Sequence, residues 1–225
     1  MTSENGLEKI VLEPSTAASA CVIWLHGLGA DGNDFVPIVP ILKLPENHGV
    51  RFIFPHAPVR PITLNGGMEM RGWYDIVAPN LKRDVDESGI KSSAAAIRQL
   101  IDAETASGIH PKNIIVAGFS QGGAIALHVG LRYEQSLAGI MALSTYLPFP
   151  NRLSDELHPA NNHTPVFVGH GSADSMVPEQ LGASIVSTLN ENGIPTVYHT
   201  YPMEHAVSAE EIDDIAKWLL ERLAL

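Results

Sequence analysis

The sequence predicts an α/β protein with a mostly parallel central sheet and helices on both faces of that sheet. Short apolar segments rich in β-branched residues alternate along the chain with segments whose apolar residues recur at helical spacing. Several short segments are continuously apolar, which is typical of parallel strands covered on both faces. The length of 225 residues fits one domain spanning residues 1–225.

The expected strands and helices follow one another in order. The strands are expected at 21–25, 50–55, 113–119, 138–143, 165–170 and 196–201. Helices are expected at 88–106, after Ser120, at 178–192 and after Ser208, where Ser208 and Glu211 form a capping box. Two long stretches, 56–86 and 147–164, fit neither pattern, and loops of such length are usually functional or mobile.

Composition and charge exclude several classes of function. The chain is 45% hydrophobic and carries a formal net charge of −11, which disfavours nucleic acid as a partner. The single cysteine, Cys21, lies in an apolar run and cannot form an internal disulfide. The sequence shows neither a signal peptide nor an apolar stretch of membrane-spanning length. We therefore expect a soluble, cytoplasmic protein without stable membrane insertion.

Ser120 stands in the segment IIVAGFSQGGAIAL, residues 114–127, between an expected strand and an expected helix. A Gly-x-Ser-x-Gly pattern in this context is typical of a sharp turn that exposes a nucleophilic serine. Gly118 and Gly122 remove side chains that would collide at such a turn. The backbone N–H of Gln121, at the start of the helix, is expected to stabilise an oxyanion.

A nucleophilic serine needs a base, and the base needs an acid that orients it. In proteins with this kind of turn the chain order is serine, acid, histidine. The aspartates that follow Ser120 are Asp155, Asp174, Asp213 and Asp214. The last two have no histidine after them, and Asp155 lies in an irregular stretch, whereas Asp174 follows an expected strand by a short turn.

Only His199 and His205 follow Asp174. His199 lies within an alternating strand, so its ring should face one side of the sheet. His205 comes after that strand, at the edge where Ser120 and Asp174 are expected. The sequence therefore predicts Ser120, Asp174 and His205 as a catalytic triad.

The segment HGLGADGNDF, residues 26–35, directly follows the first expected strand. Its glycines let the backbone approach a substrate closely, and the N–H of Leu28 is the expected second oxyanion donor. His26 is interpreted as a structural histidine that supports this loop. No metal-binding pattern accompanies it, so no metal site is expected.

Six segments carry a resemblance to a known family: HGLGADGNDF, PVRPITLNGGMEMRGWYDI, GFSQGG, ALSTYLP, GHGSADSMVP and MEH. Together they resemble the phospholipase/carboxylesterase family of α/β-hydrolases, which includes acyl-protein thioesterases and small bacterial carboxylesterases. The resemblance implies hydrolysis of esters and thioesters without a cofactor, and it matches Ser120, Asp174, His205, Leu28 and Gln121 to the family's catalytic and oxyanion positions. It also implies acyl-chain contacts at Met70, Trp73, Tyr146 and Met176. Ala30 and Tyr146 indicate the bacterial carboxylesterase branch.

The function expected from these residues is that of a serine carboxylesterase acting on short to medium acyl esters. An acyl-protein thioesterase or lysophospholipase is the alternative enzyme, and an inactive hydrolase fold that binds ligands is the alternative of another class. The expected partner is a small or lipid-like acyl ester or thioester, and a homodimer is the candidate assembly. Since a histidine base must be neutral, activity should fall at acidic pH.

Overall fold

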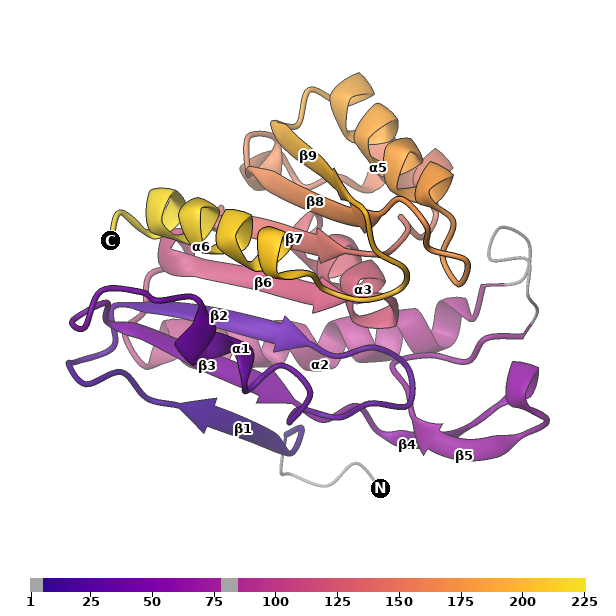
Figure 1. Cartoon of the computed structure of the whole chain (residues 1–225), viewed down its shortest axis with the longest axis horizontal. Helices are drawn as coiled ribbons and strands as arrows, with labels where there is room; N and C mark the ends of the chain where they lie inside the picture. The colour runs from indigo at the N-terminus through magenta and orange to yellow at the C-terminus, as the bar shows by residue number, and fades with distance from the viewer. Residues whose placement is uncertain (1–5, 78–84) are drawn as a thin grey trace.

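The centre of the molecule is a seven-stranded sheet with the strand order β1-β3-β2-β6-β7-β8-β9 (Figure 1). The computed structural model describes residues 6–77 and 85–225. Its sheet strands are β1 (Lys9–Leu12), β2 (Ala20–Leu25), β3 (Val50–Pro55), β6 (Ile114–Phe119), β7 (Gly139–Leu143), β8 (Val166–Gly171) and β9 (Thr196–Tyr201). β1 pairs antiparallel with β3, and the other pairings in this sheet are parallel. The predicted mostly parallel sheet is confirmed.

Helices cover both faces of the sheet, as predicted. In Figure 1, α1 (Ile38–Ile41) and α6 (Ala209–Leu223) lie on one face, and α2 (Glu87–Ala106), α3 (Gln121–Gly130) and α5 (Glu179–Glu191) lie on the other. Each face has its own apolar layer. Trp24, Phe52 and Trp218 belong to the first layer, and Ile97 and Ile125 belong to the second. The sheet is therefore buried on both sides, which explains its continuously apolar strands.

The two stretches expected to be irregular contain regular secondary structure. Within the stretch 56–86, β4 (Val59–Ile62) and β5 (Met68–Arg71) form an antiparallel hairpin beside the main sheet. Gly66 and Gly67 form its turn with φ of 67° and 82°, a conformation that favours glycine. The part at 78–84 lies outside the described residues. The stretch 147–164 contains the short helix α4 (Leu153–Glu156).

Two further expectations need correction. β1 was not among the expected strands, because it has only four residues, at the edge of the sheet, and is partly exposed. The capping box at the start of α6 is incomplete: Ser208 Oγ accepts a hydrogen bond from Glu211 N, but the Glu211 carboxyl group points inward and is buried beside Gly169. Among the helices of the described residues, none combines the length and apolarity that crossing a bilayer requires.

Candidate active site

Three side chains meet at the carboxyl edge of the parallel strands. Ser120 follows β6, Asp174 follows β8 and His205 follows β9. Ser120 Oγ lies 2.9 Å from His205 Nε2, and His205 Nδ1 lies 2.7 Å from Asp174 Oδ2. The Asp174 carboxylate accepts the Nδ1–H bond, which leaves Nε2 free to accept the hydroxyl proton of Ser120. The structure therefore brings the three sequence-predicted residues into one hydrogen-bonded chain.

The backbone at Ser120 is strained. Its φ of 53° and ψ of −119° are rare for a residue with a side chain. Ser120 N donates to Leu143 O at 2.8 Å, and Ser120 O accepts a hydrogen bond from Thr145 Oγ1 at 2.6 Å. A Cβ atom at Gly118 would collide with the backbone of Gly122. The turn thus requires glycine, for the reason that the sequence suggested, and the two hydrogen bonds hold the serine in place.

The turn that carries Asp174 is anchored on both sides. Asp174 Oδ1 accepts hydrogen bonds from the backbone N–H groups of Met176 and Val177, at 2.9 and 2.8 Å. His170, fully buried in β8, donates from Nε2 to Val177 O at 2.8 Å. Sequence reasoning missed His170, although a polar residue in a buried strand was a signal. Gly182 of α5 makes room for the ring, because a Cβ there would overlap it.

The two expected oxyanion donors, Leu28 and Gln121, line the same cavity as Ser120. Gln121 is the first residue of α3, where backbone N–H groups have no partner within the helix. Leu28 lies in the loop after β2 and lines the same cavity as Ser120 and Gln121. Each N–H therefore belongs to a segment at the cavity of the nucleophile, where an oxyanion donor is expected.

His26 supports the loop of Leu28. Its Nδ1–H donates to Gly27 O at 2.7 Å, and its Nε2 accepts from Ala57 N at 3.0 Å. The bond from Ala57 N needs the neutral ring, because a protonated Nε2 cannot accept, and burial lowers the pKa of His26 to about 4. These contacts agree with the interpretation of His26 as a structural histidine.

The side chain of Gln121 has a second role that the sequence did not indicate. Its Oε1 accepts from Trp73 N at 2.7 Å, and its Nε2 donates to Tyr74 O at 2.6 Å. Trp73 Nε1 in turn donates to His26 O at 2.9 Å. Gln121, Trp73 and His26 therefore link the helix carrying one oxyanion donor to the loop carrying the other.

Of the four predicted substrate contacts, Trp73 is the one that does not line the cavity with Ser120. Its side chain has no exposed surface and packs against the His26 ring, at 5.3 Å between ring centroids. It does not line the cavity, because its indole N–H is held by His26 O inside the protein. The prediction that Trp73 contacts the acyl chain is therefore wrong. Its place at the cavity is taken by its neighbour Tyr74.

An open cavity of about 570 Å³ contains Ser120 and His205. The sequence-predicted residues Met70, Tyr146 and Met176 line it, and Met176 lies at its mouth with 71% of its surface exposed. Leu64, Tyr74, Ile76, Phe119 and Val177 add further apolar surface. No group of three His, Cys, Asp or Glu side chains suited to a metal ion occurs at 6–77 or 85–225.

Comparison with known proteins places the chain among ester and thioester hydrolases. A family model described as Phospholipase/Carboxylesterase matches residues 7–222. Acyl-protein thioesterase 1 of Neurospora crassa is 43% identical over 95% of this chain and 91% of its own length. Carboxylesterase SOBER1 of Arabidopsis thaliana is 34% identical, over 92% of each chain.

Solved structures agree with these matches. The crystal structure of SOBER1 has a TM-score of 0.86 at 33% identity and covers 91% of this chain and 99% of its own. Acyl-protein thioesterase 2 of Zea mays has a TM-score of 0.83 at 27% identity, with coverage of 96% and 99%. Because a fungal thioesterase shares 43% identity, Ala30 and Tyr146 do not by themselves indicate a bacterial branch. This chain belongs to the phospholipase/carboxylesterase family of α/β-hydrolases.

Proposed function

We propose that this protein is a serine hydrolase that cleaves carboxylic esters of short to medium acyl chains. The observation that carries the proposal is the chain of hydrogen bonds from Asp174 through His205 to Ser120, which opens into an apolar cavity. A nucleophile with its base and a surface for an acyl chain are thereby present in one place.

The reaction follows from this geometry. His205 Nε2 takes the proton of Ser120 Oγ as that oxygen attacks the acyl carbonyl carbon. The backbone N–H groups of Leu28 and Gln121 bind the oxyanion. Protonated His205, held by Asp174, then gives its proton to the leaving oxygen or sulfur, and an acyl-enzyme forms on Ser120. Water, activated by the same histidine, releases the acid and restores the serine.

A second candidate is hydrolysis of thioesters on acylated proteins, which the 43% identity to a fungal acyl-protein thioesterase favours. Ester hydrolysis and thioester hydrolysis differ in their leaving group, since a thiolate leaves more readily than an alkoxide. Hydrolysis of lysophospholipids is the third candidate for the same cavity. An inactive ligand receptor would have no need of an aligned base beside Ser120, so we favour an enzyme.

A fluorophosphonate probe and matched substrates test this proposal. Wild type should be labelled at Ser120 and should hydrolyse oxygen and sulfur esters of the same acyl chain. Ser120→Ala should lose labelling and about four or more powers of ten in ester hydrolysis while it stays folded. A folded Ser120→Ala variant with near wild-type turnover would refute the proposal. The ratio of sulfur-ester to oxygen-ester kcat/KM decides between the first two candidates.

The assembly and the location of the protein stay predictions. Light scattering of the purified protein tests the homodimer, and cell fractionation tests the cytoplasmic location.

A further inference from the structure

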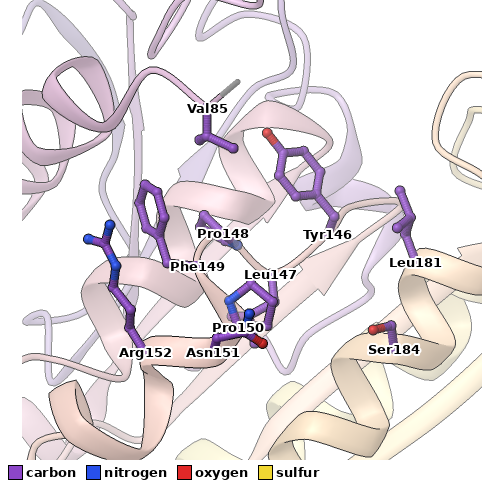
Figure 2. A pocket seen from close by; sticks show the side chains of 10 residues that line it. All are labelled: Val85, Tyr146, Leu147, Pro148, Phe149, Pro150, Asn151, Arg152, Leu181 and Ser184. Atoms are coloured by element: carbon purple, nitrogen blue, oxygen red, sulfur yellow. The ribbon is translucent and has the colours of Figure 1, made fainter. Parts of the chain in front are cut away.

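A second cavity adjoins the catalytic one. It has a volume of about 440 Å³ and is lined by Tyr146, which also lines the catalytic cavity. Figure 2 shows Leu181 and Ser184 extending from α5 on one side and Phe149 and Arg152 on the other. Its exposed lining is more apolar than polar, so a hydrocarbon chain suits it.

The boundary between the two cavities is held in place by a hydrogen bond. The Tyr146 hydroxyl lies 2.7 Å from the Tyr74 hydroxyl, and both side chains are buried. Tyr74 lines the catalytic cavity only. An antiparallel bridge joins Ile76, which lines the catalytic cavity, to Val85, which lines the second. The ring of Tyr146 and this bridge thus separate two spaces that are both apolar.

We propose that Tyr146, fastened by the Tyr74 hydroxyl, sets the longest acyl chain that the enzyme hydrolyses efficiently, and that the second cavity receives the end of a longer chain once Tyr146 moves. This inference rests on the proposed function, because it names which acyl chains the same site takes. Its occupant is the acyl chain itself. The argument for that occupant is that Tyr146 is a wall of both cavities, so displacement of its ring would open the second cavity to the space in which the acyl group meets Ser120.

Simple energetics predict the shape of the chain-length profile. Each methylene that leaves water for the catalytic cavity raises kcat/KM by up to about fourfold. A chain that reaches Tyr146 gains nothing from further methylenes until the ring is displaced. Displacement breaks the hydrogen bond to Tyr74, and one such bond opposes it by about fivefold. The profile of wild type should therefore rise with chain length and then level off.

The test is kcat/KM for p-nitrophenyl esters from butyryl to myristoyl, below the concentrations at which they form micelles, each normalised to the butyryl value of the same variant. Tyr146→Ala should keep rising where wild type levels off, with a myristoyl-to-butyryl ratio at least tenfold above that of wild type. Tyr74→Phe should raise this ratio by up to about fivefold, since it removes the hydrogen bond and keeps the ring. Tyr133→Phe is the matched control, because it removes the bond from another buried tyrosine to Asp102 (2.7 Å) away from both cavities.

A filling variant shows where the longer chain goes. Ser184→Trp, added to Tyr146→Ala, should return the myristoyl-to-butyryl ratio toward that of wild type by occupying the second cavity. If Tyr146→Ala does not fold, as judged by circular dichroism, Tyr146→Val replaces it. A crystal structure of the folded variant with a myristoyl-length phosphonate on Ser120 should place the tail beside Phe149 and Leu181.

The outcomes separate the two proposals. If wild type hydrolyses no acyl ester or thioester of any length, the proposed function fails. If wild type is active but Tyr146→Ala keeps the wild-type profile, or Ser184→Trp leaves the gain intact, the role of Tyr146 is refuted and the esterase stands. A phosphonate tail that leaves by the mouth near Met176 refutes it in the same way.

Discussion

Replacement of Gln121 by methionine tests whether its side chain holds the oxyanion site together. Methionine keeps the length and volume of the side chain and the backbone N–H, but it can neither accept from Trp73 N nor donate to Tyr74 O. Gln121 is buried, so Gln121→Met leaves one N–H and one carbonyl group without a partner inside the protein. Each such group costs about 1–3 kcal/mol, which gives a loss of about 2–6 kcal/mol in the free energy of unfolding.

The same variant should also slow the reaction. Trp73 donates to His26 O, and Gly29 N donates to Arg71 O at 2.8 Å, so the loop of Leu28 rests on the segment that Gln121 holds. Loss of a whole oxyanion donor costs about 10²–10³ in kcat. Because Gln121→Met displaces the Leu28 donor without deleting it, we expect a decrease of about tenfold to a hundredfold, mostly in kcat.

Urea unfolding and steady-state kinetics measure the two effects. Gln99→Met, on the exposed side of α2, is the matched control and should stay within about 0.5 kcal/mol of wild type. If Gln121→Met loses less than 1 kcal/mol and keeps the wild-type kcat, the link between the two donors has no energetic role and this reasoning is wrong.

Three further variants test other parts of the structure. His205→Ala should abolish activity almost as fully as Ser120→Ala. His199→Ala removes a half-buried ring that stacks on Phe167 and Tyr201 and should change kcat/KM by less than threefold; the reverse result in ester assays would show that His205 is not the base. Met70→Ser should reduce kcat/KM for octanoyl esters more than for acetyl esters, and an equal loss at every length would show that Met70 does not touch the chain. Burial raises the pKa of Glu211 from 4.5 to about 8. Between these pH values the folded protein keeps a proton that the unfolded chain releases. The free energy of unfolding should therefore fall as the pH rises from about 4.5 to 8. Relative to wild type, Glu211→Gln should therefore gain up to about 1.4 kcal/mol per pH unit in urea unfolding from pH 5 to 8, and a constant difference across that range would contradict this.

The strands, and the meeting of Ser120, Asp174 and His205, could be predicted from sequence pattern and chain order. The expected strands 50–55 and 196–201 have the bounds found in the structure, since both are flanked by polar or turn-forming residues. Ser120, Asp174 and His205 follow from chain order and from the rule that parallel strands end at one edge.

What the sequence did not indicate depends on contacts between distant segments. The sequence suggested that Trp73 contacts the acyl chain. Its partner His26 is 47 residues away in the chain, and only the fold brings the two together. The hydrogen bonds of the Gln121 side chain and the pairing of Tyr74 with Tyr146 are of the same kind, because each joins residues more than 45 positions apart. The hairpin β4–β5 was not predicted because its short strands include Pro61 and bury only Ile62.

The chemistry and the choice of acyl chain rest on different parts of the molecule. Ser120 and Asp174 follow the buried strands β6 and β8, and His205 follows the edge strand β9, so the core beneath β6 and β8 supports their geometry. The catalytic cavity is lined largely by segments outside the sheet, such as the hairpin with Met70, the loop residue Tyr146 and the turn at 175–177. Substitutions there should alter chain-length preference and leave the reaction intact. The exception is 71–74, which borders the cavity and also supports the Leu28 loop, so changes in that segment should affect both at once.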